Sequence, residues 1–179
     1  MGNNGDEMKK RNVSASARDE EASTYEVLAC TNTALRRAAR RLGNLYDDAL
    51  APSGLKATQV GLLSEIQRWA AANDGQAPTL QDLAGKLAIQ ISALTHALRP
   101  LVRDGLVELQ PDEQDRRTKR GALTTVGEAR LGEAIEHWAM ANQRVESVLG
   151  PDSAATLRAL ADLVASDEFL AAYSGSEEE

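Results

Sequence analysis

The 179-residue chain has few of the side chains on which disulfide scaffolds, metal sites and many enzymes depend. It contains one cysteine, Cys30, and two histidines. A single cysteine excludes an intramolecular disulfide framework and fits a reducing compartment. One cysteine and two histidines provide neither a nucleophile–base pair nor a metal-ligand spacing. The sequence therefore predicts no enzyme, no metal site and no cofactor.

Long apolar runs are also missing. No run approaches the roughly 18–20 residues that a membrane-spanning helix needs. The first 22 residues are polar and mixed in charge, without the apolar centre of a signal peptide. With 42% hydrophobic residues the chain is nevertheless globular. These features predict a cytoplasmic protein that does not contact a membrane.

Positive charge is scarce overall but unevenly placed. The formal net charge is -7, and residues 125–179 alone carry three Lys or Arg and eleven Asp or Glu. Residues 55–124 carry nine basic and eight acidic side chains. The negative net charge argues against a general binder of polyanions. It is still compatible with a small basic surface within residues 55–124.

The periodicity of apolar residues predicts a mainly helical chain with one small hairpin. Residues 1–22 and 174–179 look like frayed tails. A heptad-like stripe of Leu28, Leu35 and Leu42 predicts one helix from Ser23 to Leu50, stopped by "APSG" at 51–54. Further helices are expected at about 58–72, 80–87 with Thr79 as N-cap, 91–104, 125–149 with Thr125 and Glu128 as a capping box, and 154–172; strands are expected at 106–109 and 118–123.

This order predicts a winged helix-turn-helix. Two short helices joined by a tight turn and followed by a hairpin form a DNA-binding lobe at 55–124. A dimerisation helix at 23–54 and C-terminal dimerisation helices at 125–173 flank it. The apolar faces of 28–49, 131–149 and 157–170 exceed what one winged helix can cover, so a homodimer is expected.

The helix at 91–104 has a polar face suited to DNA. Its side chains are short near the N-terminus and cationic further along, as a helix in the major groove requires. An ordinary solvated surface helix is the alternative. The candidate DNA contacts on this helix are Ser92, Thr95, His96, Arg99 and Arg103.

A charged turn, "PDEQDRRTKRGALT" at 111–124, follows the helix at 91–104, which we call the reading helix because its polar face is the candidate for reading DNA bases. A hairpin tip beside such a helix can reach the minor groove, where arginine is favoured. Arg116, Arg117 and Lys119 are the candidate contacts, and Asp115 could hold the Arg117 guanidinium extended through a bidentate pair. Arg117 is expected to enter the minor groove, while Arg116, Lys119 and Arg120 serve phosphates or remain solvated.

Residues 80–131, with "RDGLVE", the Asp115-x-Arg117 pair and "ALTTVGE", resemble the MarR family of winged-helix regulators. The resemblance extends upstream through 34–63. It implies a homodimer that binds a pseudo-palindromic operator on double-stranded DNA, most often a repressor released by a small phenolic or anionic ligand or by an oxidant. It makes Ser92, Thr95 and His96 base readers and Arg117 the minor-groove arginine.

Two residues depart from the family pattern. Gly121 stands where a branched apolar residue is usual, so the second wing strand is expected to be loose. Gln90 stands where many members have an aspartate N-cap, which predicts a weaker start to the reading helix.

The signal that the protein senses is less clearly encoded. Cys30 is a possible redox residue, but the reactive cysteine of the organic-hydroperoxide regulators aligns with Asn32, so a packed or inert thiol is favoured. The arginines at 36, 37, 40 and 41 form a solvated face.

The candidate residues of a ligand pocket for an unknown effector are Tyr46, Trp69, His137 and Trp138, although Trp138 also fits a core stripe.

A second class of function stays open at this point. A dimeric helical adaptor or anti-repressor could keep this fold without binding DNA, and the acidic C-terminal third is compatible with it. Retention of Arg99, Arg116 and Arg117 at reading positions favours the DNA-binding regulator.

Overall fold

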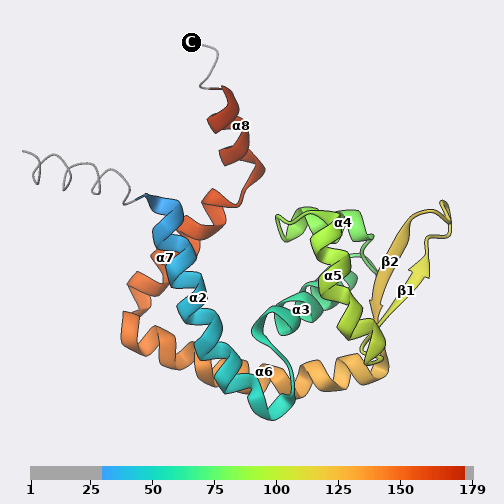
Figure 1. The fold of residues 1–179 in the computed structure, drawn as a ribbon, viewed down its shortest axis with the longest axis horizontal. Coiled ribbons are helices and arrows are strands. Elements are labelled where there is room, and N and C mark those ends of the chain that lie inside the picture. The colour runs from blue at the N-terminus through green and yellow to red at the C-terminus, as the bar shows by residue number, and fades with distance from the viewer. Residues whose placement is uncertain (1–29, 176–179) are drawn as a thin grey trace, which may run out of the picture. The chain divides into compact units, whose positions relative to one another are not determined.

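The computed structural model describes residues 30–175 of the chain. The chain divides into two units, residues 1–44 and 45–179, and helix α2 runs from the first into the second (Figure 1). In chain order the elements are α2 (Thr31–Leu50), the 3-10 turn η1 (Ala51–Ser53), α3 (Ala57–Ala72), α4 (Leu80–Lys86), α5 (Ile91–Arg103), β1 (Val107–Pro111), β2 (Lys119–Leu123), α6 (Thr125–Leu149), α7 (Pro151–Val164) and α8 (Asp167–Gly175).

Helix α2 ends where the sequence indicates. Leu50 is its buried residue, and Gly54 adopts a left-handed conformation with φ of 71° after η1. Glycine adopts this conformation without a Cβ penalty, which allows the chain to turn sharply into α3. The predicted start at Ser23 and the stripe residue Leu28 lie outside the described residues. Leu35 and Leu42 on the same stripe are half-buried.

The helix-turn-helix forms as predicted. Thr79 caps α4: its hydroxyl accepts from the Asp82 backbone N–H at 3.0 Å, and the Asp82 carboxylate accepts from the Thr79 N–H at 3.2 Å. Three leucines of α5, Leu94, Leu98 and Leu101, are almost fully buried in the core. This buried face packs against α4 and β1, so the opposite face of α5 is turned to solvent.

The start of α5 matches the expectation of a weak cap. Gln90 occupies the N-cap position and makes no side-chain hydrogen bond there. The preceding turn contains Ala88 with φ of 51°, a left-handed conformation that costs a residue with a Cβ about 1 kcal/mol. Packing of the leucine face, rather than capping, therefore supplies most of the stability of this helix.

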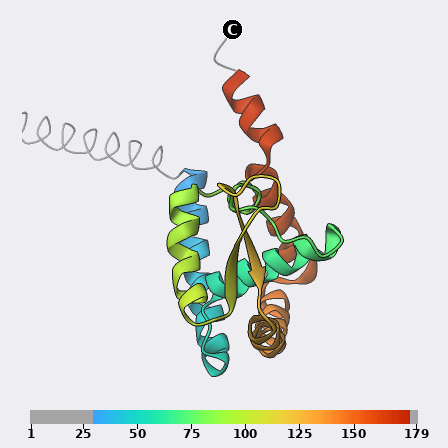
Figure 2. The same cartoon turned by 90° about the vertical axis from the view of Figure 1, so that its right-hand side faces the viewer.

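The wing strands pair in register from Val107 opposite Leu123 to Pro111 opposite Lys119, and they run alongside α5 (Figure 2). The expectation of a loose second strand was wrong. Gly121 is buried, pairs with Leu109, and donates its N–H to the Pro78 carbonyl at 3.0 Å on the other edge. Strand β2 is thus paired with β1 on one edge and bound to the Pro78 carbonyl on the other.

The N-terminus of α6 differs from the sequence prediction by one residue. Thr124, not Thr125, is the N-cap, because its hydroxyl accepts from the Gly127 N–H at 3.0 Å. Thr124 also donates to the Gly105 carbonyl at 2.6 Å. Gly127 lies against Leu106 so closely that an added Cβ would overlap the Leu106 carbonyl oxygen. The helix thus begins in direct contact with the chain that leaves α5.

The single last helix predicted at 154–172 is wrong. Two helices are present, α7 and α8, which meet at Ala165 and Ser166. The Ser166 hydroxyl donates to the Leu163 carbonyl at 2.8 Å and accepts from the Phe169 N–H at 3.1 Å. This serine ends one helix and begins the next, as its short polar side chain allows. The break after Leu149 at Gly150 is confirmed.

Candidate nucleic-acid interface

The solvent face of α5 presents all five predicted side chains: Ser92, Thr95, His96, Arg99 and Arg103 are exposed. Thr95 donates its hydroxyl hydrogen to the Ile91 carbonyl at 2.8 Å, so its oxygen is left to act as an acceptor. The first three side chains project from the N-terminal half of the helix, the part that enters a major groove in helix-turn-helix proteins.

Arg103 already forms an ion pair with the residue that follows it. Its guanidinium binds the Asp104 carboxylate through two bonds of 2.8 and 3.2 Å. Hydrogen bonding to Arg103 lowers the pKa of Asp104 below its ordinary value, and the same bond raises the pKa of Arg103. The N–H donors that Asp104 does not use remain available on this exposed guanidinium for a phosphate.

The wing carboxylates are used differently from the prediction. Asp115 does not hold the Arg117 guanidinium. Its Oδ1 accepts from the Arg117 backbone N–H at 3.0 Å, and its Oδ2 accepts from the Thr118 hydroxyl at 3.1 Å. A short aspartate side chain readily reaches the backbone two residues on, and this shapes a turn. Asp115 therefore orients the wing tip through its main chain.

The four wing cations fall into two groups. Arg116, Arg117 and Lys119 are exposed and form no ion pair with any residue in 30–175. Arg120 was expected to serve phosphates or remain solvated, and this is wrong. Its Nε lies 2.5 Å from Asp112 Oδ2 and its Nη1 lies 2.5 Å from the Ala77 carbonyl oxygen. One cation of the turn, Arg120, is paired with a carboxylate, and the other three are exposed to solvent.

Asp112, which the sequence prediction passed over, is the most constrained carboxylate of the wing. Its pKa is lowered by the backbone N–H of Asp115 first, then by Arg120 and the N–H of Gln114. Because the folded pKa lies below the unfolded one, these bonds stabilise the fold above the ordinary carboxyl pKa. That contribution is lost as the pH falls through the lower, folded value.

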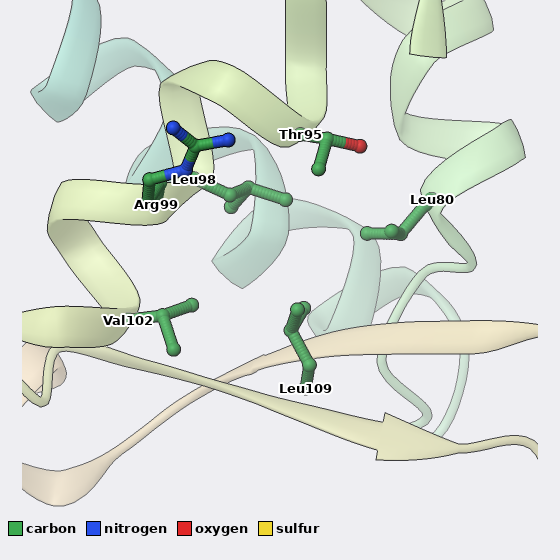
Figure 3. A pocket seen from close by; sticks show the side chains of 6 residues that line it. All are labelled: Leu80, Thr95, Leu98, Arg99, Val102 and Leu109. Atoms are coloured by element: carbon green, nitrogen blue, oxygen red, sulfur yellow. The ribbon is translucent and has the colours of Figure 1, made fainter. Parts of the chain in front are cut away.

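A hollow of about 180 Å³ lies between α5 and the wing (Figure 3). Its lining is apolar apart from one hydroxyl and one guanidinium, and Leu98, Leu80 and Leu109 project into a common space. It lies at a different place from the predicted ligand pocket. The lining residues are Leu80, Thr95, Leu98, Arg99, Val102 and Leu109.

Two of the four predicted pocket residues are in direct contact. The rings of Tyr46 and Trp138 have centroids 4.5 Å apart, and the Tyr46 hydroxyl donates to Asn142 Oδ1 at 2.9 Å. Burial, followed by the charge of Glu146, raises the pKa of Tyr46. Trp69 is half-buried on α3 and His137 is half-buried on α6; neither makes a ring contact within residues 30–175. A ligand pocket at these four residues stays a prediction.

Of the two expectations for Cys30, a packed thiol is wrong, because the residue is exposed just before α2, and an inert thiol stays a prediction. Its Sγ lies 3.2 Å from the Thr33 hydroxyl oxygen, and the hydrogen bond lowers the pKa of the thiol. A lowered pKa increases the share of reactive thiolate.

We expect Cys30→Ser to leave operator affinity and its response to peroxide unchanged, because Cys30 lies outside the residues proposed to bind DNA and the chain has no second cysteine. The measurement is an anisotropy titration with and without peroxide. Release of DNA by peroxide in the parent but not in the variant would make Cys30 the sensor.

Within residues 30–175, no helix is both long and apolar enough to cross a membrane. The same residues contain no group of three or more His, Cys, Asp or Glu side chains that could hold a metal ion.

A short helix-turn-helix followed by a hairpin, with cations exposed on both, defines a winged-helix DNA-binding protein. The model of the MarR family matches residues 55–119. The solved structures include transcriptional regulator MosR of M. tuberculosis in complex with DNA, at 35% identity and a TM-score of 0.64. That match covers 75% of this chain and 92% of MosR. The chain therefore belongs to the MarR family of DNA-binding transcriptional regulators.

Two further solved structures are similar. A mutant of MarR from E. coli, complexed with operator DNA, is 26% identical with a TM-score of 0.68, and the match covers 78% of this chain and 96% of MarR. The repressor CouR, from Rhodococcus jostii RHA1, bound to a 23-mer DNA duplex, is 25% identical with a TM-score of 0.67; the match covers 79% of this chain and 96% of CouR. No curated protein matches the chain.

Proposed function

We propose that this chain is a homodimeric repressor that binds a pseudo-palindromic operator through α5 and the wing and is released by a small anionic or aromatic ligand. The observation that carries the DNA-binding part is the separation of charge in the wing. The carboxylates of Asp112 and Asp115 are bound to the turn's own backbone, to Thr118 and to Arg120, whereas Arg116, Arg117 and Lys119 extend into solvent.

The proposed division of labour follows the geometry of α5 and the wing. Ser92, Thr95 and His96 lie on the N-terminal half of α5 and would meet base edges in the major groove. Arg99 and Arg103, further along the helix, would contact a guanine or phosphates. Arg117 would enter the minor groove beside the helix, and Arg116 and Lys119 would serve phosphates.

Exposed apolar side chains support the homodimer. Leu160 on α7 is 56% exposed, Leu170 on α8 is 63% exposed and Val148 on α6 is 82% exposed. Burial of such side chains in an interface is favourable by about 25 cal/mol per Å² of apolar surface removed from water. Similar side chains follow the same three helices: Ile135, Met140, Leu149, Leu157, Leu163, Val164 and Phe169.

Light scattering of the free protein should give twice the mass of the 179-residue chain at micromolar concentration. Addition of a duplex from the protein's own upstream region should give one dimer per duplex, whereas a shuffled duplex of equal length should remain unbound at physiological salt. A monomer would contradict the assembly. A dimer that binds neither duplex would favour the adaptor function instead.

The proposed ligand is a small carboxylate or phenol held near Tyr46 and Trp138, where two rings in contact and a hydroxyl lie together. An apolar wall with one or two polar groups is typical of small-molecule sites. A thermal-shift screen of aromatic acids and acyl-thioesters tests this part, since a ligand that binds the folded state alone raises the melting temperature. A hit whose shift survives Tyr46→Phe and Trp138→Leu would place the ligand elsewhere.

A further inference from the structure

The Asp112–Arg120 pair is the least exposed ion pair of the described residues. Their side chains are 11% and 21% exposed. Exposed ion pairs contribute little because water solvates both partners, whereas a shielded pair fixes the relative position of the segments that carry it.

Each partner of the pair also binds backbone. Asp112 Oδ1 accepts from the N–H groups of Gln114 and Asp115, both at 2.9 Å. Arg120 Nη1 donates to the Ala77 carbonyl, which belongs to the loop between α3 and α4. One carboxylate and one guanidinium therefore connect the wing turn, strand β2 and the loop that leads into α4.

The loop bound by Arg120 is itself part of the DNA-binding lobe. Pro78 accepts from the Gly121 N–H at 3.0 Å, and Thr79, one residue further on, caps α4. Helix α4 in turn packs against α5. By contrast, the hollow beside Leu109 shows that apolar packing between the hairpin and α5 is incomplete (Figure 3). The polar connection supplies the support that packing leaves out.

We propose that Asp112 and Arg120 are positioning residues that set the direction of the wing tip relative to α5, so that Arg117 meets the minor groove while α5 lies in the major groove. This inference rests on the proposed DNA-binding role of the wing. Arg120 itself does not touch DNA, because its guanidinium is occupied by a carboxylate and a carbonyl and is largely hidden from solvent.

The first test needs no DNA. Arg120→Met removes both bonds and keeps a side chain of similar length, and Lys119→Met removes one charge from the exposed neighbouring position. In the full-length free protein, backbone amides of Gln114, Asp115 and Gly121 should exchange with solvent at least about tenfold faster in Arg120→Met. They should exchange at the parental rate in Lys119→Met. Equal exchange in Arg120→Met and the parent would overturn the inference.

The second test is a double-mutant cycle on a duplex from the protein's own upstream region. If Arg120 acts by aiming Arg117, Arg120→Met should weaken binding about tenfold in the parent and less than about twofold in Arg117→Ala. Arg120→Lys, which keeps one donor to Asp112, should recover part of the loss and serves if the methionine variant folds poorly. If Arg120→Met weakens binding by the same factor in Arg117→Ala as in the parent, Arg120 acts on DNA independently of Arg117 and the inference would be wrong. Parental affinity in Arg117→Ala would contradict the proposed function of the wing, and the exchange rates alone would then decide whether the pair positions the tip.

Discussion

Gly127→Ala is expected to destabilise the fold by about 3 kcal/mol or more, because the added methyl group meets backbone rather than a movable side chain. Its Cβ would overlap the Leu106 carbonyl oxygen and lie 2.9 Å from the carbonyl carbon. Leu106 cannot retreat easily, since its oxygen accepts from the Thr124 N–H at 3.1 Å and its own N–H donates to the Leu101 carbonyl at 2.9 Å. Either α6 or the chain leaving α5 must shift.

The measurement is thermal unfolding followed by circular dichroism. For a chain of this length, about 3 kcal/mol corresponds to a fall of about 6–12 °C in Tm. Gly132→Ala is the matched control, because it lies on the same helix and its added Cβ would meet nothing within 4 Å. The control should gain about 0.5–1 kcal/mol from the better helix propensity of alanine. Similar melting temperatures for the two variants would contradict the close contact at Leu106.

Arg117→Ala should weaken operator binding at least tenfold at about 150 mM salt. A direct contact is typically worth about 1–3 kcal/mol per site, and a two-fold dimer loses it at both half-sites. The side chain is exposed and unpaired within the described residues, while Asp115 holds its backbone N–H, so the guanidinium is available to DNA at no cost in broken bonds. Fewer released counterions should also flatten the dependence of affinity on salt.

Lys119→Ala is the control for charge, since it removes one cation from the same wing and should have a much smaller effect. Both variants should fold and dimerise normally, because the tip of the wing lies outside the core. The experiment is an anisotropy titration on the upstream DNA at several salt concentrations. If Arg117→Ala binds as tightly as the parent, the wing is not a DNA-binding element and the adaptor function gains support.

Local signals in the sequence predicted the elements that carry the site. The leucine spacing of α5, Thr79 before α4 and Gly105 after α5 act over one or two helical turns, and the structure confirms each of them. The exposed face of α5 followed directly, because burial of one face fixes the other. Exposure of Arg116, Arg117 and Lys119 was likewise predictable from a charged hairpin tip.

Features that depend on competing or distant partners were not predictable. The sequence favours Thr125 as the N-cap because Glu128 follows three residues later, but Thr124 takes that position and also binds the Gly105 carbonyl, 19 residues away in the chain. The break at Ser166 has no glycine or proline to mark it. Arg120 finds a carbonyl 43 residues away, and Asp115 uses the backbone where a side-chain pair was equally reasonable. The hairpin register, which places 111 opposite 119, is the signal that could have brought Asp112 and Arg120 together.

Helix α6 is connected by hydrogen bonds to two separate places: the chain just after α5, and Tyr46 on α2. At its start, Thr124 donates its N–H to the Leu106 carbonyl at 3.1 Å, just beyond α5. Further along, Asn142 binds the Tyr46 hydroxyl at 2.9 Å, beside the proposed ligand position. The helix is continuous over its 25 residues from Thr125 to Leu149, which corresponds to a length of about 37 Å.

A rod of this length converts a small rotation into a large displacement. A tilt of about 5° moves one end by about 3 Å, close to the roughly 3.4 Å axial rise of one base pair. In a two-fold dimer the reading helices would move together and change their separation along the duplex. Movement of the C-terminal helices would therefore change the spacing between half-sites that the dimer fits best. The affinity for operators with one base pair added or removed at the centre would measure this change.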